Sequence, residues 1–161
     1  MNKLSKGERM VLWTGVALFV LSWIPLWAKA EASAFGFSVS ESANAFQGFG
    51  FFPVELGLIL AYVALALGIA RVAGAKMSLP GATYAGLCGA ATVLLILGIL
   101  IGPDDGGAGA VGVEVSRGLM LFVGTVVAAA MAWGGYQHMN EGAAAPTTPP
   151  VPQAPQAPQA P

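Results

Sequence analysis

Hydrophobic residues run almost without interruption in four stretches of the chain, which are separated by polar or glycine-rich segments. The stretches cover approximately residues 10–28, 54–73, 82–101 and 118–136. Each is close to the ~20 residues that a helix needs to cross the roughly 30 Å hydrocarbon core of a bilayer. The pattern therefore predicts an all-α membrane protein, with a bundle of four transmembrane helices within residues 10–139.

Two shorter segments, residues 35–40 and 111–116, alternate between large apolar and small or polar side chains. A period of two residues is typical of a β-strand. One segment lies between the first two hydrophobic stretches and the other between the last two, so both emerge on the same side of the membrane. We expect them to pair as a small two-stranded antiparallel sheet that caps the outer end of the bundle.

The two ends of the chain differ from the hydrophobic stretches. Residues 1–9 form a short polar leader, and residues 140–161 consist largely of alanine, proline, glutamine and threonine. A segment with so few large apolar side chains cannot bury a core, and proline favours the polyproline II conformation. We therefore expect a disordered, proline-rich C-terminal tail.

The composition supports lipid as the main solvent of this chain. Hydrophobic residues make up 56% of the sequence and charged residues 9%, whereas a soluble chain carries about 25% charged residues. The net charge is −1, and no basic patch with interleaved aromatic residues is present, so we expect the lipid bilayer and no nucleic acid as a partner.

Positive charges predict which side of the membrane each segment occupies, because short loops rich in Lys and Arg stay in the cytoplasm. The leader contains Lys3, Lys6 and Arg9, and the second stretch is followed by Arg71 and Lys76. The other connecting segments are richer in acids. We expect both termini to be cytoplasmic, and the Ala-, Gly- and Val-rich composition favours a bacterial plasma membrane.

A cleaved signal peptide is the alternative interpretation of the first stretch. The basic leader fits this alternative, and Ala28-Lys29-Ala30 has the small-x-small form of a cleavage site. The hydrophobic run is longer than the typical core of about 7–15 residues. We therefore favour a retained span, and the other three spans are unaffected by this choice.

Small residues recur at four-residue spacing in the last three stretches. Lipid competes with apolar side chains for helix surfaces, so helices in a bilayer associate through close packing at such positions. These seams serve either packing within one bundle or self-association of two copies, and they are Gly57/Ala61, Ala64/Gly68, Gly81/Ala85/Gly89, Gly86/Ala90 and Gly124/Ala128/Ala132.

Catalytic and metal-binding patterns are not apparent in the sequence. No set of nucleophile, base and acid can be assembled, His138 is expected at the surface, and Cys88 is expected to be a small packing residue. The Asp104-Asp105-Gly106 segment lacks the alternating acids of a calcium loop. We therefore expect no enzymatic activity, no cofactor and no metal.

Two groups of residues are candidates for a structural or binding role. Glu55 lies just inside the outer boundary of the second stretch and Arg117 lies at the same level before the fourth, which predicts a structural ion pair between them. The outer loop carries phenylalanines that could form an interaction surface, namely Phe35, Phe37, Phe46 and Phe49.

Short motifs in the outer segments resemble those of a family of small four-span membrane proteins common in actinobacteria. They are the segments 22–27, 36–40, 44–46 and 115–118, with sequences SWIPLW, GFSVS, NAF and VSRG. The resemblance covers about residues 9–139. This chain has Ile-Pro-Leu-Trp where relatives more often have Leu-Pro-Trp, and Phe46 where they usually have Trp. The resemblance implies the four-span topology, and the family carries no assigned activity.

The sequence as a whole favours a non-enzymatic, multi-pass plasma-membrane protein with a structural, accessory or protein-interaction role. Another membrane protein, or a second copy bound through a Gly/Ala seam, would be its partner. The alternative is an oligomeric transporter or channel for a small solute or lipid-like molecule, with Glu55 at its mouth.

Overall fold

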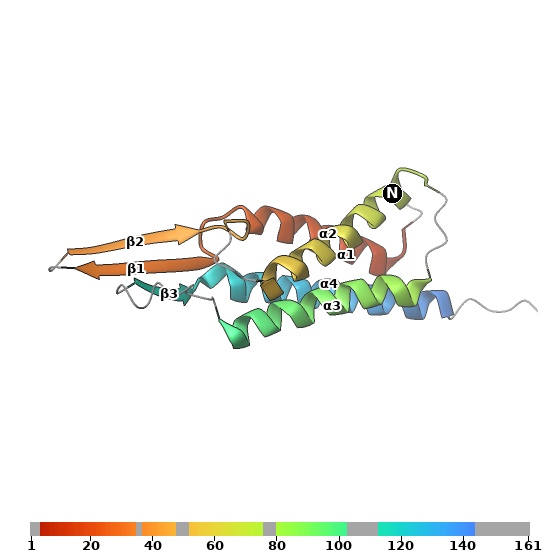
Figure 1. The fold of residues 1–161 in the computed structure, drawn as a ribbon. Helices are drawn as coiled ribbons and strands as arrows, with labels where there is room; N and C mark the ends of the chain where they lie inside the picture. Colours follow the sequence, from red (N-terminus) through yellow and green to blue (C-terminus); the bar gives the residue numbers. More distant parts are fainter. Residues whose placement is uncertain (1–3, 35–36, 48–51, 76–79, 103–112, 144–161) are drawn as a thin grey trace, which may run out of the picture.

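The computed structural model describes residues 4–34, 37–47, 52–75, 80–102 and 113–143. In chain order, its elements are α1 (Lys6–Ser22), β1 (Ala28–Ala34), β2 (Phe37–Ala43), α2 (Phe52–Val72), α3 (Gly81–Ile101), β3 (Val113–Arg117) and α4 (Leu119–Ala143). The helices lie side by side as a bundle, and the strands project from one end of it (Figure 1). The start of α1 and the end of α4 both lie at the opposite end.

Three of the helices, α2, α3 and α4, are long and apolar enough to cross a membrane. Helix α1 has 17 residues, which gives a length of about 26 Å at 1.5 Å per residue. The prediction of a mainly helical protein with helices that are long and apolar enough to span a membrane is therefore confirmed. A fourth crossing by α1 stays a prediction.

Helix α1 begins and ends earlier than the predicted stretch at residues 10–28. It begins at Lys6 within the predicted polar leader, because Ser5 caps it: the Ser5 hydroxyl accepts from the Glu8 N–H at 3.1 Å, and the Glu8 carboxylate accepts from the Ser5 N–H at 3.0 Å. It ends at Ser22, shortly before Pro25, which has no N–H to continue a helix.

The last helix, in contrast, extends further than the sequence predicted. Helix α4 continues to Ala143, past the expected end at residue 136 and into the segment 140–161 that was expected to be disordered. Residues 144–161 lie outside the described part of the chain.

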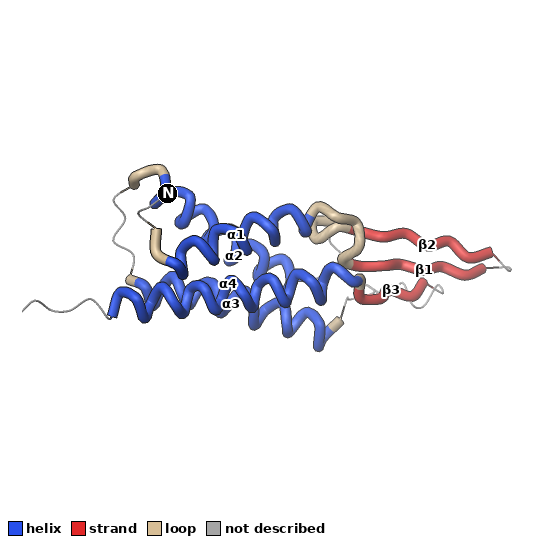
Figure 2. The backbone as a smooth tube through the Cα atoms, turned by 180° about the vertical axis from the view of Figure 1, so that it is seen from behind, coloured by secondary structure: helices blue, strands red, loops and turns tan. Residues whose placement is uncertain are grey.

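The sheet has three strands rather than the predicted two. Its order is β2-β1-β3, and β1 is antiparallel to both neighbours, with Ala30 opposite Glu41 on β2 and Val115 on β3 (Figure 2). The described parts of the segments 35–40 and 111–116 are strands, as predicted. The prediction that they pair with each other is wrong, because β1 lies between them.

The four helices form a ring in which α4 packs against α1 and α3, and α2 packs against α3 and less extensively against α1. A hydrogen bond also joins two helices: the Thr92 hydroxyl on α3 donates to the Ala128 carbonyl on α4 at 2.8 Å. The interior is filled by fully buried side chains, of which the largest are Tyr84, Leu18, Leu58, Leu95, Leu121, Met131, Val11 and Cys88.

Glycines allow α4 to approach both of its neighbours closely. A Cβ added to Gly7 on α1 would lie 2.5 Å from both the Gly134 carbonyl oxygen and the His138 nitrogen. A Cβ added to the adjacent Gly135 would lie 3.1 Å from the Ala85 Cα on α3. Side chains at these positions would push the helices apart, so the small residues determine the separation of the helices.

The predicted Gly/Ala seams have different surroundings. On α2, the seam residues Gly57, Ala61, Ala64 and Gly68 are all buried, and a Cβ on Gly57 would lie 3.0 Å from a carbonyl of α3. On α3, Gly86 is exposed and has open space around its Cα. The α2 seam therefore packs within the bundle, whereas the Gly86/Ala90 seam faces outward.

Trp27 joins the sheet to the bundle. Its indole N–H donates to the Leu21 carbonyl of α1 at 2.8 Å, and its ring lies where a side chain on Gly124 of α4 would be. Its backbone N–H donates to the Ala43 carbonyl at 3.0 Å, and its carbonyl accepts from the Gly118 N–H at 2.9 Å. One buried residue thus connects α1, both neighbouring strand ends and the start of α4.

The glycine contact between α1 and α4 predicts opposite outcomes for two identical substitutions. Gly7→Ala should destabilise the protein by about 1–3 kcal/mol, because the added methyl group meets backbone atoms of α4. Gly86→Ala is the matched control and should change stability by no more than about 1 kcal/mol, in the stabilising direction, because alanine favours helix and space is available. Thermal unfolding in detergent measures both, and equal effects would contradict the assigned packing.

Candidate functional site

Polar side chains from all four helices meet at the end of the bundle away from the sheet. We call this group the terminal cluster, and it comprises Ser5, Glu8, Arg71, Tyr84 and His138. Glu8 is 8% exposed and Tyr84 is 1% exposed. The start of α1, the end of α2, the start of α3 and the end of α4 each supply at least one member, because neighbouring helices run in opposite directions.

The central interaction of the terminal cluster is an ion pair between α1 and α2. The Arg71 Nη1 atom lies 2.6 Å from the Glu8 Oε1 atom, and their side chains are 17% and 11% exposed. A contact of this length is a charge-assisted hydrogen bond, which is stronger than a neutral one. Because the other oxygen of Glu8 accepts from the Ser5 N–H, the carboxylate also stabilises the start of its own helix.

The neighbours of His138 determine which ring nitrogen carries the proton. Its Nε2 atom lies 3.1 Å from the Arg71 Nη1 atom, and its Nδ1 atom lies 3.1 Å from the Ser5 Oγ atom. A guanidinium can only donate hydrogen bonds. Nε2 must therefore accept, and Nδ1 donates its proton to the Ser5 hydroxyl, so that His138 links α4 to both α1 and α2.

The residue types Ser5, His138 and Glu8 resemble a nucleophile, base and acid, but their hydrogen bonds run in the wrong direction. A catalytic base must accept the proton of the serine, whereas His138 donates to the Ser5 oxygen. Glu8 lies 3.8 Å from the His138 Nε2 atom and is bonded more closely to Arg71. The arrangement is suited to holding helices together.

Tyr84 fills the space beneath the charged members of the terminal cluster. Its ring meets the His138 imidazole edge-to-face at a centroid distance of 5.7 Å, and the Arg71 guanidinium carbon lies 5.7 Å from the ring centroid. Both arrangements are favourable for an aromatic ring. The Tyr84 hydroxyl has no hydrogen-bond partner among the described residues, so the ring, not the hydroxyl, makes the stabilising contacts.

The predicted partners Glu55 and Arg117 are not brought together. Arg117 donates to the Leu100 carbonyl at 3.4 Å, and Glu55 lies at a hollow of about 280 Å³ lined also by Phe46 and Tyr62. Height in the membrane was the basis of the prediction, but Arg117 ends β3 and its side chain bonds to the end of α3, whereas Glu55 lies in the first turn of α2. The Lys and Arg residues that pair with a carboxylate within 4.0 Å among the described residues are Lys29, with Glu31, and Arg71, with Glu8.

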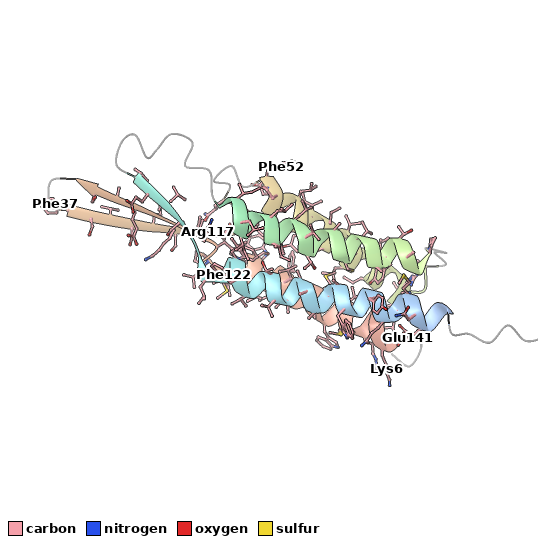
Figure 3. All side chains as sticks on the ribbon, turned by 90° about the horizontal axis from the view of Figure 1, so that it is seen from below. Lys6, Phe37, Phe52, Arg117, Phe122 and Glu141 are labelled. Atoms are coloured by element: carbon pink, nitrogen blue, oxygen red, sulfur yellow. The ribbon has the colours of Figure 1, made fainter. Side chains whose placement is uncertain are left out.

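Two of the four predicted phenylalanines of the outer surface can be located. Phe37 begins β2 at the tip of the sheet and is 80% exposed (Figure 3). Phe46 is 46% exposed and packs against Trp23 and Tyr62, at ring-centroid distances of 5.3 and 6.2 Å. Phe35 and Phe49 lie outside the described residues.

One side of the sheet is mainly apolar, because residues directly opposite each other on paired strands share a face. We call the apolar part of this side the sheet face, and it comprises Phe37, Val39, Ala30, Ala32, Val113 and Val115. Two charged residues lie on the same side, namely Glu41 opposite Ala30 and Arg117 opposite Ala28. Val39 is 68% exposed, so with Phe37 it presents apolar surface beyond the bundle. The opposite side carries Lys29, Glu31 and the serines of β2.

The terminal cluster was not predicted from the sequence, although Arg71 and His138 were each considered separately. His138 was expected at the surface, whereas its side chain is 17% exposed and in contact with three helices. The position of each residue relative to the spans could have predicted the cluster, because the antiparallel order of the spans brings Glu8, Arg71 and His138 to the same end of the bundle.

No protein-family model matches the chain, and no curated protein matches it either. Function is therefore inferred from the contacts and the exposed surfaces of this chain.

The terminal cluster predicts a large effect for neutralising one partner of its ion pair. Glu8→Gln should destabilise the protein by about 3 kcal/mol, because it leaves the Arg71 charge nearly buried without its carboxylate. The matched control is Glu31→Gln, which removes a carboxylate from an exposed pair and should change stability by less than about 1 kcal/mol. Thermal unfolding in detergent compares the two variants, and similar losses would contradict a stabilising role for the cluster.

Proposed function

We propose that this protein is a non-enzymatic, four-pass protein of a bacterial plasma membrane that presents its sheet outside the cytoplasm as a contact surface for another membrane protein. The observation that carries the proposal is the exposed sheet face, which is joined to the helices through the buried Trp27. The bundle would hold this surface at a defined height and orientation.

The position of α1 supports a fourth crossing. Helix α1 packs extensively against α4 and also contacts α2, and both of these helices can span a membrane. Its start lies at the end with the terminal cluster and β1 follows it at the sheet end (Figure 1). If α2 and α4 cross the bilayer, α1 lies beside them at the same depth in the bilayer.

The sheet also supports retention of the first helix. The candidate cleavage site at residues 28–30 lies in β1, the middle strand, which pairs with both other strands. Cleavage there would cut the sheet at its centre and would remove Ser5 and Glu8 from the terminal cluster. A retained α1 is therefore the better explanation of these contacts.

The distribution of charge supports an orientation with the terminal cluster in the cytoplasm. Among the described residues, the end with the terminal cluster carries Lys6, Arg9 and Arg71 against Glu8 and Glu141. The sheet end carries more acids than bases, namely Glu31, Glu41, Glu55 and Glu114 against Lys29 and Arg117. An excess of Lys and Arg marks the cytoplasmic side.

The sheet face suits a protein partner better than solvent. Large apolar side chains exposed together commonly mark interaction sites, and Phe37 and Val39 lie on the same side of one strand. The edge strand β2 has β1 as its single partner strand in the described sheet. A partner with a complementary apolar patch would bury this surface.

The transporter or channel alternative has one observation in its favour, the hollow of about 280 Å³ beside Glu55 and Tyr62. A transported solute also needs a polar path through the bundle. The largest fully buried side chains of the described helices are mainly apolar, which favours the interaction role.

The proposed topology predicts which side of the membrane is labelled in intact cells. In a Cys88→Ala background, Ser38→Cys on the sheet should react with a membrane-impermeant thiol reagent added to whole cells. Glu141→Cys at the end of α4 should react after the cells are lysed and not before. Both sites are exposed in the structure, so labelling of Glu141→Cys in intact cells would overturn the orientation.

The proposed role of the sheet face predicts crosslinking from one side of β2. A photoreactive amino acid at Val39 should give a discrete adduct with one membrane protein in living cells, whereas the same group at Ser40, on the other side of the strand, should not. Phe37→Asp should weaken the adduct from position 39 at unchanged protein level. Equal adducts from both sides, or none from Val39, would contradict the proposal.

A further inference from the structure

A groove runs between α1 and α2 near the terminal cluster. It has a volume of about 430 Å³. It occurs where these two helices pack less extensively than α4 packs against its neighbours. Most of the side chains around it are apolar, and those that matter here are Leu12, Trp13, Val16, Ile69, Val72 and Arg9.

The character of the groove changes along the helix axis. Arg9 lies toward the start of α1, and Val16 lies seven residues further on, a distance of about 10 Å at 1.5 Å per residue. Trp13 lies between them and is 68% exposed, as is common for tryptophan at the level of lipid headgroups. The groove therefore combines a cationic end with an apolar interior.

The positive charge at this end is available to a ligand. Glu8, the acid adjacent to Arg9 in sequence, is engaged by Arg71 at 2.6 Å. The ion pairs found among the described residues include neither Lys6 nor Arg9. Both side chains are exposed, and they lie three residues apart on α1, so they are neighbours on the helix surface.

We propose that this groove binds an anionic glycerophospholipid, with one acyl chain along the apolar side chains and the phosphate at Arg9. The inference rests on the membrane location proposed above. An arginine guanidinium matches a phosphate group in charge and geometry, and basic pockets between transmembrane helices bind acidic lipid headgroups. Charge complementarity at Arg9 favours the anionic lipid over a neutral one.

Trp13 provides a reporter for the test, because brominated acyl chains in contact with an indole quench its fluorescence. The full-length protein is placed in phosphatidylcholine nanodiscs that contain increasing fractions of brominated phosphatidylglycerol, and in a second series brominated phosphatidylcholine. The signal of Trp13 is the difference between the wild-type protein and Trp13→Phe. We expect its quenching to show a preference of roughly fivefold for phosphatidylglycerol, the size of effect that one basic residue gives at a membrane surface.

Two arginine variants serve as test and control. Arg9→Gln should abolish the preference, whereas Arg117→Gln, which removes the same charge at the sheet end, should leave it unchanged. Equal quenching of Trp13 by both lipids in the wild-type protein would overturn the proposal without requiring any variant. If a second copy of the protein occupied the groove in place of lipid, both lipids would quench Trp13 equally and each nanodisc would contain a dimer.

The same measurement separates this inference from the proposed membrane location. Trp133 on α4 is 56% exposed and lies on a helix that can span the bilayer. If brominated lipid quenches Trp133 but shows no headgroup preference at Trp13, the membrane location stands and the lipid site is wrong. If neither tryptophan is quenched, the membrane location itself is wrong.

Discussion

The close contact between α1 and α4 is the constraint on which both ends of the molecule depend. At one end, Gly7 lies against the backbone of Gly134 and His138. At the other end, the contact continues through the residues that follow α1: Leu26, whose carbonyl lies against Gly118, and Trp27, whose ring covers Gly124 of α4. In lipid, such contacts replace hydrophobic burial as the source of helix association. They place His138 beside Ser5 and Glu8, and they bring β3 beside β1.

The sequence predicted those elements whose signal is local. The lengths of the hydrophobic runs located α2, α3 and most of α4, and alternation located β2 and β3. It did not locate β1, because alanine disfavours strands and the segment follows directly on a hydrophobic run. Lys29 and Glu31 alternate with alanines there, which was the available signal. Trp27 is 3% exposed and joins the sheet to the bundle, a role that no local pattern around it indicates.

The terminal cluster could not be predicted from local signals, because its hydrogen-bonded members are separated by as many as 133 residues in sequence. The failed Glu55–Arg117 prediction shows which information was lacking. Equal height in the membrane is necessary for an ion pair but not sufficient, since the two side chains must also lie side by side. Glu8 and Arg71 meet across two adjacent helices. Arg117 instead ends β3 and donates to the Leu100 carbonyl of α3, away from Glu55 on α2.

Helix α1 makes a close contact with α4 and a looser contact with α2. It packs against α4 through glycine, and the Glu8–Arg71 bond holds α1 and α2 together at one end. Below this bond the helices are separated by the groove beside Leu12 and Ile69. In water such an apolar groove would favour closure, but in a bilayer an acyl chain can occupy it at little cost. A bundle with one open side is therefore stable in lipid, and the polar bond replaces the packing that the open side lacks.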